Sequence, residues 1–106
     1  MTTKEIAERK RRFRLEFLPS IIGTKFHVPR GYGHAAYEIV GGGEEWRTGD
    51  HIKIYIDMAK RPPVICNYGG DSVVAIVVKR VGGYSGPPTA PTLQVLLEDF
   101  DKIREN

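Results

Sequence analysis

The chain has 106 residues, of which 41% are hydrophobic and 27% charged, and its formal net charge at pH 7 is +3. These values predict one folded domain over residues 1–106 and exclude a disordered chain. No apolar run approaches the roughly 20 residues of a membrane helix, and no apolar stretch of a secretory signal follows the charged N-terminus. Cys66 is the only cysteine, which excludes an internal disulfide. We therefore expect a cytoplasmic (intracellular) protein that does not enter membranes.

The first segment, residues 2–18, is predicted to form a basic amphipathic helix. Thr2 and Glu5 have the spacing of a capping box. Pro19 predicts that the helix ends at Leu18, because the residue before proline avoids helical backbone angles. At about 100° per residue, three apolar side chains share one face of this helix: Ile6, Phe13 and Phe17.

The basic residues of this helix divide between two flanks. The pairs Glu5–Arg9 and Glu8–Arg12 have the i,i+4 order that favours ion pairs, so we expect these arginines to be neutralised locally. The other flank has few local acids, and we call its three residues the basic stripe: Lys10, Arg11 and Arg14. The stripe indicates either an anionic partner or a solvated helix face that confers solubility.

The charge is spread unevenly along the chain. Residues 1–30 hold eight Lys/Arg and three Glu (+5), residues 31–92 hold six of each sign (0), and residues 93–106 hold two basic and four acidic residues (−2). Because electrostatic fields act locally, this asymmetry is more informative than the net charge.

Residues 36–81 are predicted to form a mostly antiparallel sheet of roughly four strands. Glycine turns separate short β-like segments, and one of these, His51–Asp57, alternates between apolar and polar residues as a half-buried strand does. Residues 64–68 and 71–81 flank Gly69-Gly70 and predict a β-hairpin, whose second strand is apolar enough to be central. Cys66 is expected to be a buried, inert thiol within that hairpin.

Residues 82–91 are rich in glycine and proline and are predicted to be a linker. Residues 92–104 are predicted to form a C-terminal helix, because five apolar residues follow helical spacing: Leu93, Leu96, Leu97, Phe100 and Ile103. One flank of that helix is acidic, so the two terminal helices could pair within a chain or across a homodimer. The predicted fold is therefore α+β, with a partly open small barrel flanked by the helices as the alternative.

The segment of residues 25–34 contains the densest set of functional side chains and is predicted to be a loop. Lys25 and Arg30 are candidates to bind phosphate, and Tyr32 is a candidate to stack on a base. His27 and His34 are weak candidates for the acid and base of RNA cleavage.

Other site types receive little support. We expect no metal site, since His27, His34 and His51 lack the i,i+4 ligand spacing and no cysteine pair accompanies them. We expect no cofactor, because the three glycine clusters match no phosphate-binding motif and are predicted to be turns and hinges. Trp46 and Tyr55 lie close in sequence to basic residues, a pattern of either core anchors or a nucleic-acid-binding sheet.

The resulting hypothesis is a non-enzymatic protein that binds RNA or DNA, mainly through phosphate contacts of the basic stripe, extended by Lys25, Arg30 and Tyr32. Replacing the three stripe residues with alanine should then reduce the salt dependence of binding by roughly three contacts. One alternative is a protein-interaction module, either a homo-oligomer or a small inhibitor or adaptor of phage or viral type. Another is a small ribonuclease, or a binder of a phosphorylated metabolite, that uses residues 25–34.

Overall fold

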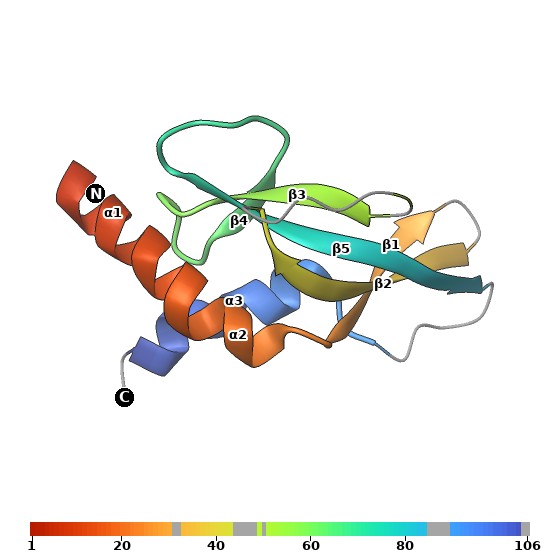
Figure 1. Ribbon diagram of the computed structural model, residues 1–106. Helices are drawn as coiled ribbons and strands as arrows, with labels where there is room; N and C mark the ends of the chain where they lie inside the picture. Colours follow the sequence, from red (N-terminus) through yellow and green to blue (C-terminus); the bar gives the residue numbers. More distant parts are fainter. Residues whose placement is uncertain (31–32, 44–48, 50, 85–89, 105–106) are drawn as a thin grey trace.

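The helices from the two ends of the chain lie together on one side of a five-stranded sheet (Figure 1). The computed structural model describes residues 1–30, 33–43, 49, 51–84 and 90–104. Its elements are, in chain order, α1 (Thr3–Arg12), the π-helix η1 (Phe13–Phe17), α2 (Leu18–Ile21), β1 (Lys25–Arg30), β2 (Gly33–Gly42), β3 (His51–Asp57), β4 (Val64–Cys66), β5 (Val73–Tyr84) and α3 (Leu93–Arg104). The predicted α+β class is confirmed.

The sheet has the strand order β1-β2-β5-β3-β4, and every neighbouring pair is antiparallel. It curves into a half-barrel, and α3 contacts both edge strands, β1 and β4 (Figure 1). The prediction of roughly four strands within residues 36–81 therefore gave one strand too few and too short a range of residues, since the strands extend from Lys25 to Tyr84. The strand that it omitted, β1, contains Pro29, which an edge strand tolerates because its missing N–H need not join a ladder.

The N-terminal helix begins as predicted but ends later. The Thr2 side chain accepts a hydrogen bond from the Glu5 amide, and the Glu5 carboxylate accepts one from the Thr2 amide, so the capping box is confirmed. The chain stays helical through Ile21, three residues beyond the predicted end. A π turn precedes Pro19, with the Leu18 amide bonded to the Phe13 carbonyl, and this wider turn accommodates the proline ring within the helix.

The predicted hairpin of residues 64–68 and 71–81 is wrong. β4 pairs with β3, while β5 lies between β2 and β3 and bonds to both. The long apolar β5 needs partners on both edges, and a three-residue β4 cannot supply one. β5 is central, as predicted. Cys66 is half-buried on the edge strand β4, not buried in a strand interior.

Two glycine clusters lie within strands instead of turns. Gly41 and Gly42 belong to β2, and Gly82 and Gly83 belong to β5, so the linker predicted at residues 82–91 begins as a strand. The β2–β5 register shifts next to both clusters, where glycine permits a bulge. Residues 44–48, which include Trp46 and one of the expected short β-like segments (Glu44–Arg47), lie outside the described residues.

One face of the sheet and all the helices share the hydrophobic core. Phe13, Phe17 and Phe100 form a ring cluster with centroids 5.4 to 5.7 Å apart, and Phe26 of β1 stacks on Tyr37 of β2. The alternating residues of β5 that point into this core include Val74, Ile76 and Val78. Helix α3 forms as predicted, and its Leu93, Leu97 and Phe100 are buried.

Candidate functional site

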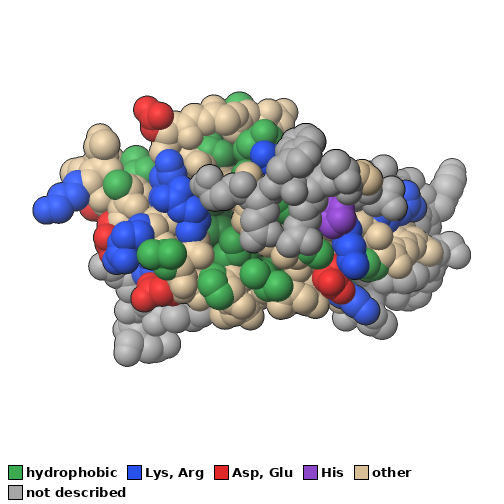
Figure 2. Space-filling model, in the orientation of Figure 1, with side chains coloured by type: hydrophobic (Ala, Val, Ile, Leu, Met, Phe, Trp, Pro, Cys, Tyr) green, Lys and Arg blue, Asp and Glu red, His purple; other side chains and the backbone are tan. Residues whose placement is uncertain are grey.

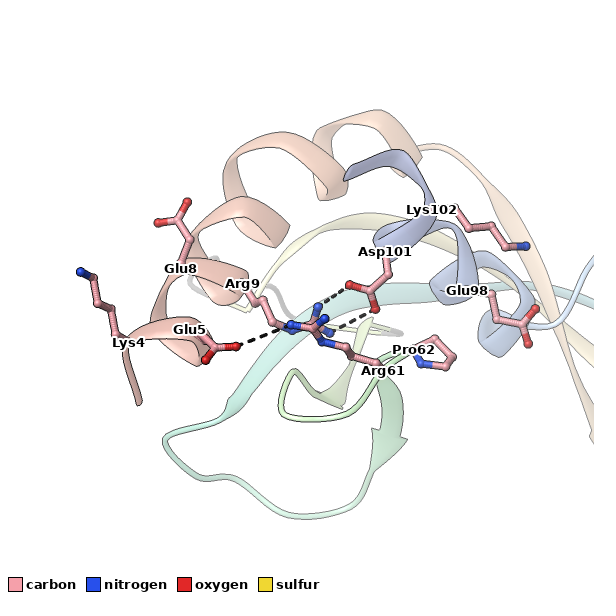
Figure 3. Close-up of a pocket in the computed structure, with 9 residues that line it drawn as sticks. All are labelled: Lys4, Glu5, Glu8, Arg9, Arg61, Pro62, Glu98, Asp101 and Lys102. Atoms are coloured by element: carbon pink, nitrogen blue, oxygen red, sulfur yellow. Dashed lines mark hydrogen bonds and ion pairs between the residues drawn. The ribbon is translucent and has the colours of Figure 1, made fainter. Parts of the chain in front are cut away.

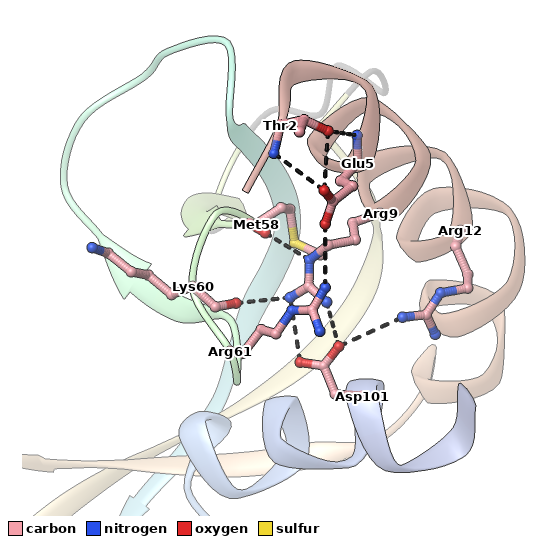
Figure 4. Close-up of polar contacts among 8 residues, drawn as sticks. All are labelled: Thr2, Glu5, Arg9, Arg12, Met58, Lys60, Arg61 and Asp101. Carbon is pink, nitrogen blue, oxygen red and sulfur yellow. Dashed lines mark hydrogen bonds and ion pairs between the residues drawn. The ribbon is translucent and has the colours of Figure 1, made fainter. Parts of the chain in front are cut away.

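Two arginines of α1 point inward instead of toward solvent (Figure 4). Arg9 is 3% exposed and forms an ion pair with Asp101 of α3. Its Nε donates to the Met58 carbonyl at 2.8 Å, and its Nη2 donates to the Lys60 carbonyl at 2.7 Å. The guanidinium of Arg9 therefore joins α1, the loop after β3 and α3.

Arg12 lies one turn further along the same face. Its Nη1 donates to the Phe100 carbonyl at 3.0 Å, and its guanidinium carbon lies 3.7 Å from the centroid of the Phe100 ring. Its Nη2 lies 3.7 Å from an Asp101 oxygen. The terminal helices thus pair within the chain, but through Arg9 and Arg12 and not through the basic stripe.

Both glutamates of the predicted i,i+4 ion pairs contact other residues. Glu5 completes the capping box and lies 3.7 Å from Arg61, and Glu8 pairs with Arg11 at 2.7 Å. The arginines predicted to pair with these glutamates, Arg9 and Arg12, turn into the protein instead, because carbonyl oxygens and Asp101 offer them buried partners.

A groove of about 890 Å³ lies between α1, the loop after β3 and α3 (Figure 3). Its charged lining residues are four basic (Lys4, Arg9, Arg61, Lys102) and four acidic (Glu5, Glu8, Glu98, Asp101). The Arg9 side chain in this groove already donates to two carbonyls and a carboxylate. A charge-balanced groove of this kind has no electrostatic preference for a polyanion.

The basic stripe lies on the outward side of the same helix, and Figure 2 shows Lys and Arg side chains gathered over α1. The Lys10 ammonium donates to the Asp71 carbonyl at 2.7 Å, a neutral acceptor that leaves its charge in place. Arg11 is paired with Glu8, whose hydrogen bond and charge raise the pKa of Arg11. Arg14 is exposed on η1. Lys10 therefore retains more of its net charge than Arg11 does.

Arg14 lines a cleft of about 260 Å³ together with Tyr55 of β3 and the backbone of Gly69 and Gly70. We call this feature the Arg14–Tyr55 cleft. Tyr55 is 37% exposed, and the strand alternation places it on the face of the sheet opposite the core residue Ile56. A cation, an aromatic ring and two glycines without side chains thus border one small cavity.

A second tyrosine, Tyr68, lies in the loop that supplies these glycines. Its ring is 53% exposed, and its hydroxyl donates to Asp57 Oδ2 at 3.1 Å. That hydrogen bond raises the pKa of Tyr68, so the phenol stays neutral. Burial alone would raise the pKa of Asp57, but hydrogen bonds from the Ala59 amide, Ser72 and Tyr68 lower it below its usual value. A charged carboxylate therefore anchors an exposed aromatic ring.

The other predicted phosphate and base contacts lie elsewhere or outside the described residues. Lys25 begins β1, at the sheet edge opposite β4, and stands directly across from Glu38. Arg30 ends the same strand. Tyr32 lies outside the described residues. The strand order therefore places β2 and β5 between the strand of Lys25 and Arg30 and the strand of Tyr55.

The two histidines of the 25–34 segment are brought together. His27 of β1 and His34 of β2 have ring centroids 5.6 Å apart, with planes at 70°. His27 Nδ1 donates to the Ala90 carbonyl at 2.7 Å, and His34 is 8% exposed. Among the residues that the structure describes, no three His, Cys, Asp or Glu side chains gather as a metal-binding group.

Sequence reasoning missed Tyr68 and the contribution of Gly69-Gly70 to a cleft. In the sequence, Tyr68 directly precedes two glycines, and this pattern predicts a tight turn as readily as a binding loop. The proximity of this loop to Arg14 depends on tertiary packing and has no local signature.

Comparison with protein-family models, curated proteins and solved structures gave no match to this chain. Within the described residues, no helix combines the length and apolar character required to cross a bilayer.

Proposed function

We propose that this protein binds single-stranded nucleic acid at the Arg14–Tyr55 cleft. The observation that carries the proposal is that Arg14 of the basic stripe and Tyr55, an exposed aromatic side chain of the sheet, border one cavity. Proteins that hold single strands combine a positively charged track for the backbone with aromatic rings on which bases stack.

Each component of the cleft has a chemical role in this proposal. Arg14 and Lys10 neutralise phosphates, and Arg14 presents a planar fork suited to phosphate oxygens. Tyr55 offers a ring face to one base, and Tyr68, whose hydroxyl is fixed by Asp57, offers a second ring close by. Gly69 and Gly70 allow the strand to approach the protein backbone closely.

The specificity that follows from these contacts is low. Phosphate contacts carry no sequence information, and a ring face accepts any base. Binding should therefore be salt-dependent and tolerant of sequence, and it requires no catalytic group. A duplex keeps its bases stacked inside the helix, so only a single strand would engage Tyr55. The charge-balanced groove beside Arg9 is not part of this surface.

The test is fluorescence anisotropy with labelled single-stranded RNA, single-stranded DNA and duplex DNA at low and physiological salt. We expect micromolar or tighter binding to a single strand, weaker binding to the duplex, and a loss of affinity as salt increases. The affinity for single-stranded RNA, compared with that for single-stranded DNA, shows which nucleic acid the protein prefers. The absence of binding even at low salt would overturn the proposal and leave a protein partner as the next hypothesis.

Two variants separate stacking from charge. Tyr55→Ala should lower single-strand affinity by about 1–3 kcal/mol, or roughly 5- to 150-fold, because one stacking platform is removed. Tyr55→Phe keeps the ring and should bind as the unmodified protein does. Equal affinities of all three proteins would show that the strand does not stack on Tyr55.

A further inference from the structure

We propose that His27 and His34 form a binding site for one divalent transition-metal ion, of the class that imidazole binds, such as Zn²⁺ or Cu²⁺. The site lies on β1 and β2, away from the Arg14–Tyr55 cleft, and does not depend on the nucleic-acid proposal. No local sequence pattern indicates this site, because helical ligand spacing is the usual signal and these histidines are seven residues apart on neighbouring strands.

The strand register brings the two rings to the same face. His27 stands opposite Ala36, and His34 is two residues before Ala36, so the histidines are diagonal neighbours across an antiparallel pair. Diagonal neighbours on one face lie within reach of each other's side chains. Both side chains are thus held by regular strands and not by a loop, which fixes their separation.

The separation of the rings suits a shared ion. Zinc lies about 2.0–2.1 Å from each imidazole nitrogen, so two rings that bind one tetrahedral ion have centroids roughly 5–6 Å apart. The observed distance is 5.6 Å, and the planes are inclined at 70° instead of being stacked.

The hydrogen bond of His27 prepares it as a ligand. Because the Ala90 carbonyl can only accept, Nδ1 of His27 carries the proton, and in the neutral ring the lone pair is on Nε2. Metal-binding histidines commonly donate their other nitrogen to a backbone carbonyl in this way, which fixes both tautomer and ring orientation. The segment that contains Ala90 forms a second hydrogen bond with β1, in which the His27 amide donates to the Pro91 carbonyl at 3.0 Å.

With two protein ligands, water or an added ligand would complete the coordination, so the bound ion would be exchangeable. Imidazole ligands suit zinc, copper and nickel, and the Irving–Williams order predicts tighter binding of Cu²⁺ than of Zn²⁺. A purely structural role, in which His27 only fastens residues 90 and 91 to β1, predicts no effect of either ion.

The test uses the full chain without a histidine tag. Calorimetric titration with ZnCl₂ should give one site per chain, and His34→Ala should lower the affinity at least tenfold. His51→Ala removes the third histidine, which lies on β3, and should leave the affinity unchanged. Absence of Zn²⁺ binding, or equal loss in the two variants, would overturn the proposal.

A measurement on the unmodified chain covers the case in which a variant fails to fold. Electron paramagnetic resonance of the protein with one equivalent of Cu²⁺ should show coupling to two imidazole nitrogens. Coupling to one nitrogen, or none, would exclude a site shared by His27 and His34.

Discussion

The basic residues of the N-terminal helix lie in two different environments. Arg9 and Arg12 are buried between the terminal helices, where carbonyl oxygens, Asp101 and the ring of Phe100 surround them. Lys10 and Arg14 lie on the other side, beside the loop before β5 and the Arg14–Tyr55 cleft. Basic residues that are neighbours in the sequence therefore lie on opposite sides of the helix, one pair buried in the protein and the other pair at the surface.

The number of charges in a run of residues therefore does not predict the charge that a binding partner meets. The inward pair is matched to specific acceptors in a place where desolvation makes each lost partner costly. The outward residues lie at the surface, where water and salt screen their charges. Substitutions in the first group should alter folding, and those in the second should alter binding.

The largest effect is expected from Arg9→Ala. The substitution leaves the Met58 and Lys60 carbonyls without their donor and removes the principal partner of Asp101. Breaking a buried ion pair on one side costs about 3–5 kcal/mol, so the free energy of unfolding in urea should fall by that amount. Arg61→Ala is the matched control, because this exposed arginine lines the same groove and should change stability little.

A stable Arg9→Ala protein would contradict the inward assignment. It would indicate that α1 and α3 are held by the phenylalanine cluster alone, and that the buried guanidinium contributes nothing net after its desolvation.

A smaller loss of stability is expected from Arg12→Lys. Lysine keeps the charge but lacks the planar group that stacks on Phe100 at 3.7 Å and reaches its carbonyl. The free energy of unfolding should fall by about 1–2 kcal/mol. Arg14→Lys, the same exchange on the outward side, should leave stability nearly unchanged, because this side chain is exposed. Equal effects of the two exchanges would remove the distinction between the two environments.

The elements that sequence reasoning predicted well are those with a local period. The strand alternation gave β3 with its observed bounds, and the helical spacing of leucines gave α3. The pairing of β4 with β3 and the position of β5 between β2 and β3 depend on contacts between distant segments. No local pattern distinguishes that topology from a hairpin across Gly69-Gly70.

The burial of Arg9 could have been predicted from its position in the helix, but the i,i+4 spacing from Glu5 favoured an exposed ion pair instead. Arg9 stands three residues after Ile6 and four before Phe13, so it lies on the apolar face of the helix. Such a position predicts burial of the side chain whenever a distant acid is available, and Asp101, on the last helix, is that acid. Neither the Arg14–Tyr55 cleft nor the approach of His27 to His34 had a comparable signal, because both join residues of separate elements.

The double variant Lys10→Ala/Arg14→Ala should leave stability nearly unchanged and weaken single-strand binding. Each phosphate contact contributes about 0.7 to the slope of log K against log salt for a single strand, so the slope should fall by about 1.4. We expect an affinity loss on the order of tenfold at low salt. The control Arg61→Ala/Lys102→Ala removes two cations of the charge-balanced groove and should not alter the slope. If both doubles lower the slope equally, the strand responds to net charge and not to the cleft.

The smallest effect is expected from Arg11→Ala. Arg11 belongs to the basic stripe, but its guanidinium already pairs with Glu8, so its removal takes away a compensated charge and an exposed ion pair. The thermal midpoint should stay within experimental error, and the salt slope should change less than it does in Lys10→Ala alone. Glu8→Gln supplies the converse variant: it frees Arg11 from its acid and should raise single-strand affinity slightly. A slope for Arg11→Ala as low as that for Lys10→Ala would mean that the bound strand displaces Glu8, and the stripe would then act through three residues and not two.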